Sequence, residues 1–352
     1  MDRQHDKHLF TIGVVAYKNY RYIKDAINSI ITQDYSNIQL IISNDGSVDF
    51  DKEDLEKYLE ENKKENIKEI IINNNKENIG TVKNVEYIRK HAKGEFYMLL
   101  AADDALYDET VITKFVNEFN KLGEDALVLS GLAAMCSEDI TEIEYYEPSD
   151  DAIESIIKSD SRKMFNRLSH TYTIPAASTC YRKRVFDVVG SYDLEYQLIE
   201  DAPLFIKLAH IGVKFYWKKN FIAIRHRDGG VSHGNNKGSS ATLRKYQDDE
   251  LLFYEKEVIP FKNEILKKDY DLAMDKYNFC KFRYYINYLR EDMNILQRVN
   301  YLYNEMPYMF KIKIKENLIR FSKNAYNICR ELLIVLALII FVANNVKKWI
   351  KS

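Results

Sequence analysis

Short apolar runs alternate with helical segments between residues 10 and 132, and no other feature of this sequence constrains its fold as strongly. Five short apolar runs predict buried strands: residues 10–16, 38–43, 67–72, 96–101 and 126–132. The intervening segments have helical spacing or a charged helical composition: residues 22–32, 51–64, 81–91 and 108–122. Strands separated by single helices favour an α/β fold, with a mostly parallel sheet and helices on both faces.

The pattern beyond residue 134 is less regular. Residues 135–163 are acidic and weakly periodic, which predicts a loop-rich excursion. The same criteria predict a strand at 176–182, a short helix at 184–189, a helix at 201–210, an extended segment at 213–224 and helices over 241–308. The Gly- and Ser-rich segment 228–240 predicts a flexible loop, either a lid over a bound ligand or an ordinary connector.

Charge and cysteine content exclude several classes of protein. The formal net charge of −2 argues against a nucleic-acid-binding protein. The four cysteines are far apart and form no CxxC pair, so neither a zinc site nor a disulfide framework is indicated. The N-terminus, MDRQHDKHLF, is polar and has no signal-peptide pattern, which favours the cytoplasm.

Acidic residues follow two of the predicted strands and begin a later helix. Asp45 follows the second strand, Asp103-Asp104 follows the fourth, and Glu200-Asp201 begins the helix at 201–210. Carboxylates at the ends of parallel strands can hold Mg²⁺ or Mn²⁺ against a diphosphate, and a further carboxylate can take a proton from a hydroxyl. Ordinary helix capping and turn formation are the alternatives for these residues.

These acidic residues belong to a series of motifs along the chain. The motifs are Val15-Ala16-Tyr17, Ile41-Ile42-Ser43-Asn44-Asp45-Gly46-Ser47, Asn78-Ile79-Gly80-Thr81-Val82-Lys83-Asn84, Gly94-Glu95-Phe96, Leu100-Ala101-Ala102-Asp103-Asp104, Val189-Gly190-Ser191-Tyr192-Asp193 and Glu200-Asp201. In this order they resemble the family 2 glycosyltransferases of GT-A fold, and the resemblance covers roughly residues 9–235.

The resemblance implies a role for each matching residue. The implied roles are: base and ribose binding for Ala16, Tyr17 and Asp45; a basic position beside the sugar-nucleotide for Lys83; metal binding for Asp103, with Asp104 as its acidic neighbour; the catalytic base for Asp201, with Glu200 beside it; and contacts near the diphosphate for Arg225 and His226. His226 could instead be a solvated histidine of a polar loop, and Asp201 could also cap its helix.

Four positions depart from the family pattern. The proline expected before the first loop is Val15, the asparagine after Tyr17 is Lys18, and the first acid of the Asp-Asp-Gly-Ser motif is Asn44. The first acid of the DxD motif is Ala101, which removes a possible metal ligand. Asp103 can still hold Mn²⁺ or Mg²⁺ with diphosphate oxygens and water, because Mg²⁺ keeps several waters in proteins.

The expected activity is therefore that of a metal-dependent, inverting glycosyltransferase. The resemblance implies a nucleotide-sugar donor, a UDP-sugar above all, and a lipid-linked or polysaccharide acceptor in bacterial surface glycan synthesis. The departures keep an alternative open, a catalytically weakened GT-A protein that binds sugar-nucleotide or glycan and scaffolds a membrane assembly. A dinucleotide-dependent oxidoreductase is disfavoured, because no GxGxxG follows the first strand.

The C-terminal segment indicates a membrane partner. Residues 332–343 (LLIVLALIIFVA) are uninterruptedly apolar but shorter than the roughly 20 residues of a spanning helix. Residues 311–352 carry nine basic and two acidic residues, and Trp349 follows the apolar run. A segment lying in an anionic membrane surface fits this pattern, and a buried core or oligomer helix is the alternative. We expect location at the cytoplasmic face of the cell membrane, peripheral or tail-anchored.

These observations predict an order of regions along the chain. The GT-A domain spans 1–235, with a nucleotide-sugar-binding half at 1–134 and an acceptor and catalytic-base half at 135–235. A helical extension at 236–310 follows, and then the membrane-associating tail at 311–352.

Overall fold

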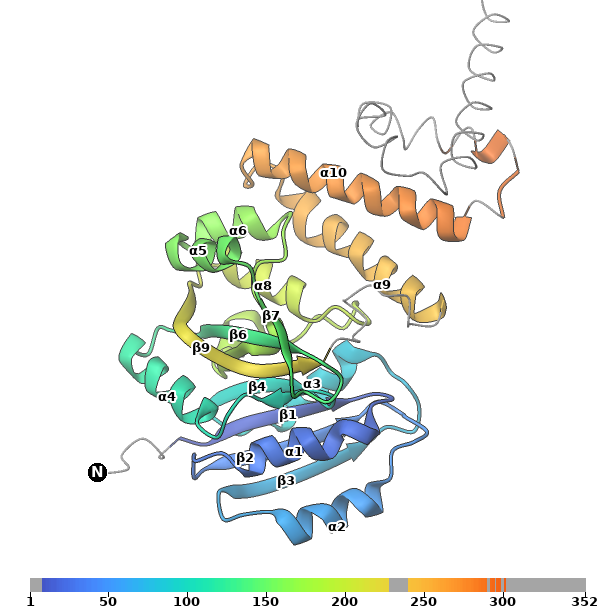
Figure 1. The fold of residues 1–352 in the computed structure, drawn as a ribbon. Helices are drawn as coiled ribbons and strands as arrows, with labels where there is room; N and C mark the ends of the chain where they lie inside the picture. Colours follow the sequence, from blue (N-terminus) through green and yellow to red (C-terminus); the bar gives the residue numbers. More distant parts are fainter. Residues whose placement is uncertain (1–7, 228–239, 290–291, 295, 299–300, 302–352) are drawn as a thin grey trace, which may run out of the picture. The chain divides into compact units, whose positions relative to one another are not determined.

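The computed structural model describes residues 8–227, 240–289, 292–294, 296–298 and 301 (Figure 1). The chain divides into two compact units, Met1–Ala273 and Met274–Ser352. The predicted tail at 311–352 and nearly all of the predicted loop at 228–240 lie outside the described residues. The order of regions given above therefore stays a prediction.

The first half of the sheet is parallel, as the alternation of strands and helices predicts. Its strands, in spatial order, are β3 (Ile67–Asn74), β2 (Ile38–Asn44), β1 (Phe10–Ala16) and β4 (Phe96–Ala101). The helices that connect them are α1 (Ile23–Ile31), α2 (Lys52–Asn62) and α3 (Thr81–His91), with a 3₁₀ turn, η2 (Tyr20–Tyr22), before α1.

The second half of the sheet is mixed. Within the described residues the sheet has nine strands, and those beyond β4 are β8 (Thr179–Arg182), β6 (Val128–Cys136), β9 (Phe215–Arg227) and β5 (Ala105–Leu106), with β7 (Ile143–Glu147) paired to β6. β8 is antiparallel to β4 and β6, whereas β6 and β9 are parallel. The predicted α/β fold is confirmed.

The remaining helices include those predicted at 108–122, 184–189 and 201–210, and a C-terminal helical region follows the sheet. They are α4 (Val111–Leu122), α5 (Asp150–Lys158), α6 (Ser161–Leu168), α7 (Val185–Val189), α8 (Asp201–His210), α9 (Ser240–Phe253) and α10 (Lys267–Tyr284). Shorter 3₁₀ and π turns are η3 (Ala176–Ser178), η5 (Tyr254–Val258), η6 (Ile259–Phe261) and η7 (Tyr285–Leu289).

The loop-rich excursion predicted at 135–163 is wrong. This region contains the end of β6, strand β7, helix α5 and the start of α6. β7 is an edge strand with no buried residue, so it lacks the apolar alternation of a buried strand. α5 buries Ala152 and Ile156, which lie four residues apart on one face, so its helical spacing is present in the sequence. The strand predicted at 213–224 is also longer, because β9 continues to Arg227 and includes two predicted site residues.

The core lies against one face of the parallel strands. Alternate β1 residues, Phe10, Ile12 and Val14, are fully buried with apolar residues of α1, α2 and α4. Each such side chain stabilises the fold by about 1.5–3 kcal/mol relative to exposure. On the opposite face, Ser43 of β2 donates to Asn84 of α3 at 2.5 Å, so α3 covers that side. Helices on both faces leave the carboxyl ends of the strands for ligand binding.

Candidate active site

The carboxyl ends of β1, β2 and β4 meet at one edge of the sheet. In the strand register Ala16 pairs with Asn44, and Val15 pairs with Ala101. The residues that follow each strand therefore lie on neighbouring strands of the same edge. Ala16 is buried and its carbonyl accepts the Asp45 N–H at 2.8 Å, while the Tyr17 ring is exposed. This edge brings together the residues to which the resemblance assigns nucleoside binding.

Asp45 holds a loop that leads into α3. Its buried carboxylate accepts from Asn78 Nδ2 at 2.8 Å, the Ile79 N–H at 2.8 Å and the Gly80 N–H at 3.0 Å. Gly80 has φ +94°, and a Cβ there would lie 2.7 Å from the Gln197 carbonyl oxygen, so only glycine fits. Asp45 thus has an internal structural role, and its contact with a nucleoside stays a prediction.

Asn44 has a structural reason to be an amide. Its Nδ2 donates to Asn74 Oδ1 at 2.8 Å, and its Oδ1 accepts the Ser47 N–H at 3.3 Å. A carboxylate at this position could only accept, so the Asn74 amide would have to turn over and donate to it. The Asn44–Asn74 bond links the ends of β2 and β3.

Asp103 lies just beyond β4 and is partly buried. Its Oδ2 accepts from Asn19 Nδ2 at 2.7 Å. Burial, and then the charge of Asp104, raise the pKa of Asp103 to about 6. Nothing in the sequence indicates the contact with Asn19, which depends on the turn between β1 and α1.

Asp104 is buried and fastens β9 to the end of β4. Its Oδ2 lies 2.8 Å from His226 Nδ1, and its Oδ1 accepts the Arg227 N–H at 3.2 Å. Burial opposes the imidazolium, but the hydrogen bond and charge of Asp104 outweigh it and raise the pKa of His226. His226 is therefore a strand residue paired with an aspartate, and the solvated alternative does not hold.

Two arginines of β9 have different surroundings. Arg225 donates to the Ile140 carbonyl at 3.0 Å and lies over the Tyr107 ring. Arg227 is buried, donates to the backbone carbonyl of Asp103 and pairs with Asp25 at 2.6 Å. Arg227 is thus the arginine bonded to the Asp103 segment. The extended segment predicted at 213–224 ends before Arg227, so the sequence pattern does not place Arg227 on a strand.

Glu200 and Asp201 form an acidic pair at the start of α8. Glu200 is the N-cap residue, without a side-chain capping bond, and Asp201 is the first residue of the helix. Asp201 is therefore not the N-cap, although its Oδ1 accepts the Ala202 N–H at 2.8 Å in the first turn. Burial, and then the charge of Asp201, raise the pKa of Glu200 to about 8. Burial also raises the pKa of Asp201, against the effect of the Ala202 N–H. A carboxylate with a raised pKa holds a proton more tightly than an ordinary carboxylate does. A pKa near the working pH is the property that general-base catalysis requires.

A continuous series of contacts links this pair to Asp45. The Val82 N–H donates to the Gln197 carbonyl at 3.2 Å, and Gly80 packs against the same carbonyl. The segment before Glu200 therefore lies on the loop that Asp45 holds. Lys83, in the first turn of α3, is exposed, and it has no ion pair within the described part of the chain.

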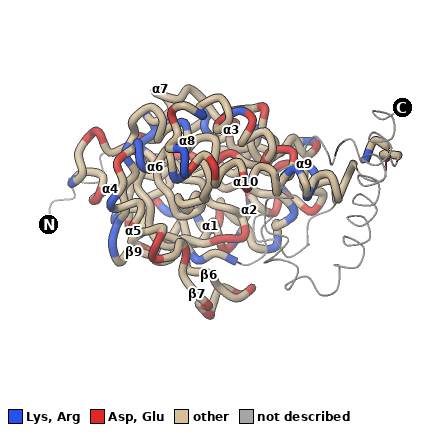
Figure 2. Tube along the Cα trace, turned by 90° about the horizontal axis from the view of Figure 1, so that it is seen from above, with Lys and Arg blue, Asp and Glu red and all other residues tan. Residues whose placement is uncertain are grey.

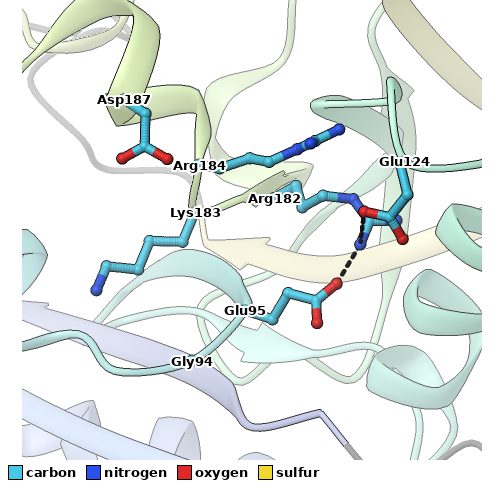
Figure 3. Close-up of a pocket in the computed structure, with 7 residues that line it drawn as sticks. All are labelled: Gly94, Glu95, Glu124, Arg182, Lys183, Arg184 and Asp187. Atoms are coloured by element: carbon cyan, nitrogen blue, oxygen red, sulfur yellow. Dashed lines mark hydrogen bonds and ion pairs between the residues drawn. The ribbon is translucent and has the colours of Figure 1, made fainter.

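A hollow of about 340 Å³ lies at the other end of β4 (Figure 3). It is lined by Gly94, Glu95, Glu124, Arg182, Lys183, Arg184 and Asp187. Arg182 is buried and paired with Glu95 and Glu124, so the charge of this hollow is compensated internally. Gly94 and Glu95 precede β4, at the amino ends of the strands, so this hollow is separate from the candidate active site.

The described residues hold no preformed metal cage. No group of three or more His, Cys, Asp or Glu side chains among them is arranged to hold a metal ion.

Lys and Arg are interspersed with Asp and Glu along the described chain (Figure 2). Among the same residues, no helix has the length and apolarity that crossing a membrane requires.

Comparison with known proteins identifies the family. The model of "Glycosyl transferase family 2" matches residues 11–190, about half of the chain. An uncharacterized glycosyltransferase of Haemophilus influenzae is 21% identical over 314 residues, which cover 83% of this chain and 94% of that protein. An uncharacterized glycosyltransferase of Rickettsia typhi is 25% identical over 221 residues, 62% of this chain and 64% of that protein.

Solved structures share the fold. Staphylococcus aureus TarS 1–349 in complex with UDP superposes with a TM-score of 0.55 at 14% identity, covering 84% of this chain and 78% of that chain. The mannosyltransferase PcManGT from Pyrobaculum calidifontis, in complex with GDP-Man and Mn²⁺, superposes with a TM-score of 0.53 at 13% identity, covering 78% and 72%. The predicted fold and enzyme class are confirmed: the chain is a glycosyltransferase of GT-A fold and belongs to glycosyltransferase family 2.

Proposed function

We propose that this glycosyltransferase is metal-dependent and inverting, and that it moves a sugar from a UDP-sugar to a hydroxyl of a membrane-linked glycan of the bacterial surface. One observation carries the proposal. The partly buried Glu200–Asp201 pair begins α8 beside a segment that contacts the loop held by Asp45. A candidate base and a candidate donor site are thereby joined through Gln197.

The donor side is formed by the edge of the parallel strands. The exposed Tyr17 ring offers an aromatic face for a base, and Lys83 offers an unpaired cation for a diphosphate. TarS has been solved with UDP and with UDP-GlcNAc, which favours a uridine donor, whereas PcManGT was solved with GDP-Man.

The residues at the end of β4 fit a metal that the donor helps to bind. Asp103 is a partly buried carboxylate with a raised pKa, so a cation beside it would relieve the repulsion from Asp104. Mg²⁺ and Mn²⁺ are commonly held by one or two carboxylates together with phosphate oxygens. Asp103 would hold the ion, and the ion would supply charge stabilisation for the departing diphosphate.

The acceptor side requires a base. Asp201, with Glu200 beside it, would take the proton of the acceptor hydroxyl as that oxygen attacks C1 of the donor sugar. A raised pKa suits this role, because a base is most effective when its pKa lies near the working pH. A single base opposite the leaving group produces one displacement and therefore inversion at C1.

The proposed acceptor is lipid-linked or a polysaccharide, and the basic and apolar tail at 311–352 supports this proposal by its sequence. Such a tail would hold the enzyme at the cytoplasmic face of the cell membrane, close to its acceptor.

A ligand screen tests the donor side. The full chain is heated with UDP-sugars and GDP-sugars, each with and without Mn²⁺, and the melting temperature Tm is recorded. We expect a UDP-sugar to raise Tm more with Mn²⁺ than without it, because a ligand that binds only the folded protein stabilises it. Sugar release from the same donor is then measured. Binding without turnover would favour the weakened, scaffolding alternative, and no stabilisation by any sugar-nucleotide would contradict the proposal.

A further inference from the structure

Helix α9 lies outside the part of the chain that the family model matches, yet it contacts the segment before Glu200. Asp249 of α9 is buried, with 1% of its surface exposed. Its carboxylate accepts three consecutive backbone N–H groups, from Gln197 at 2.9 Å, Leu198 at 2.6 Å and Ile199 at 3.0 Å. Ile199 is the residue immediately before Glu200.

A second set of contacts holds the beginning of the same segment. Lys256 of η5 pairs with Asp193 Oδ2 at 2.6 Å, and Lys207 of α8 pairs with the same oxygen at 2.8 Å. Tyr196 donates its hydroxyl to Glu257 of η5 at 3.3 Å. Residues 193–199 are therefore anchored at both ends by the helical segment 249–257.

Bonds from backbone N–H groups to a buried carboxylate are charge-assisted and hold the backbone more firmly than neutral bonds do. Asp249 makes three of them on adjacent residues, so the backbone that enters Glu200 has little freedom. The acidic pair begins at the next residue, and displacing reacting groups by about 1 Å can cost 10²-fold in rate.

We infer that Asp249 is a positioning residue for the Glu200–Asp201 pair, because it fixes the backbone from which the pair projects. The inference rests on the proposed function, in which this pair takes the acceptor proton. It assigns part of the catalytic machinery to a helix beyond residues 11–190.

Besides fixing the backbone, Asp249 carries a charge, and the effect of that charge on the pKa of Glu200 can be measured separately. The Glu200–Asp201 pair interacts electrostatically with Asp249 and with the tyrosines Tyr97, Tyr172, Tyr181 and Tyr192. Its two members also interact with each other. After burial and the charge of Asp201, the charge of Asp249 also raises the pKa of Glu200. Removing that charge would let the pair ionise at lower pH.

The test compares Asp249→Asn and Asp249→Glu with wild type in a transfer assay over a range of pH. For Asp249→Asn we expect kcat to fall roughly 10–100-fold and the donor KM to stay within about twofold, because Asp249 bonds to the backbone before Glu200 and not to the residues assigned to nucleoside binding. The acid limb of kcat should also move to lower pH. Asp249→Glu keeps the charge but displaces it, so kcat should fall while the acid limb stays in place.

Asp108→Asn is the matched control. Asp108 is a partly buried carboxylate that accepts the Thr110 N–H and pairs with Lys114, far in sequence from α8. Its loss should lower Tm without moving the acid limb. If Asp249→Asn does not fold, a lowered kcat with an unmoved acid limb in Asp249→Glu supports the inference.

The outcomes separate this inference from the proposed function. A folded Asp249 variant with the kcat and pH profile of wild type, or one that changes only Tm as Asp108→Asn does, overturns the inference and leaves the proposed function standing. A wild-type protein that turns over no sugar-nucleotide overturns the proposed function, and the inference with it.

Discussion

The two acidic regions of this glycosyltransferase are built differently. At the sheet edge, Asp45 is held by bonds within the region that the family model matches, whereas Asp104 is bonded to His226 and Arg227 of β9, beyond that region. At the start of α8, the backbone before Glu200 is held by Asp249, which lies beyond the matched region. The comparison indicates that short sequence motifs at strand ends specify the donor side. The candidate base pair, Glu200–Asp201, depends instead on α9, which contains none of the motifs.

The largest expected effect is at the base. Asp201→Asn should lower the transfer rate roughly 10²–10⁴-fold, because a general base contributes about that much, while donor binding stays unchanged. Initial rates and donor titrations measure the two quantities. Asp187→Asn, an exposed acid in the first turn of α7, is the control and should retain wild-type rates. Full activity in a folded Asp201→Asn protein would remove the base assignment.

The corresponding change on the donor side is Asp103→Asn. A donor at 100 times its Kd stabilises the folded protein by about 2.7 kcal/mol. We expect Asp103→Asn to lose the part of the donor-induced Tm rise that depends on Mn²⁺ and to keep the part that does not. Thermal melts with a UDP-sugar, with and without Mn²⁺, measure both parts. An unchanged Mn²⁺ dependence would show that the metal is held elsewhere.

Substitution of Asp45 measures how much its hydrogen bonds at the sheet edge contribute to the free energy of unfolding. Asp45→Ala leaves the N–H groups of Ile79 and Gly80 without their acceptor and should lower the free energy of unfolding by about 2–4 kcal/mol. Asp51→Ala removes an exposed helix cap and should cost about 1 kcal/mol. Urea unfolding measures both. Equal losses would mean that Asp45 does no more than an ordinary cap.

The remaining expected effect is a pH-dependent difference in stability at Glu200. A carboxyl whose pKa is raised to about 8 on folding stabilises the native state fully at pH values below its ordinary pKa and loses that contribution as the pH rises through 8. Glu200→Gln keeps the neutral form, so its Tm relative to wild type should increase from pH 5 to pH 9. Glu56→Gln, on exposed α2, should show no such trend. A constant difference would mean that Glu200 is ionised throughout.

Much of the sheet edge could be predicted from the sequence because its signals are local. Strand ends, the Asp-Gly turn at residue 45 and the acids after β4 are visible as short patterns, and the structure puts them on neighbouring strands. The oxygens of Asp45 and Asp104 accept hydrogen bonds within the protein, and the roles of both residues toward a ligand stay predictions.

The contacts that were missed depend on tertiary structure. Asp249 lies in a run of acids, Asp248-Asp249-Glu250, that resembles a solvated helix face, and only packing against residues 197–199 buries it. Arg227 lies beyond the strand predicted at 213–224, because polar residues end the apolar pattern of β9 before the strand itself ends. Nothing in the local sequence distinguishes either residue from a surface charge.

The most direct test of the account is the dependence of kcat on pH at saturating donor and Mn²⁺, measured for wild type and for Asp201→Asn. The account predicts that wild-type kcat rises with pH along an acid limb above the range of an ordinary carboxylic acid, and that Asp201→Asn lacks this limb and is slow at every pH. A wild-type rate that is flat from pH 5 to pH 9, or an unchanged limb in Asp201→Asn, would contradict it.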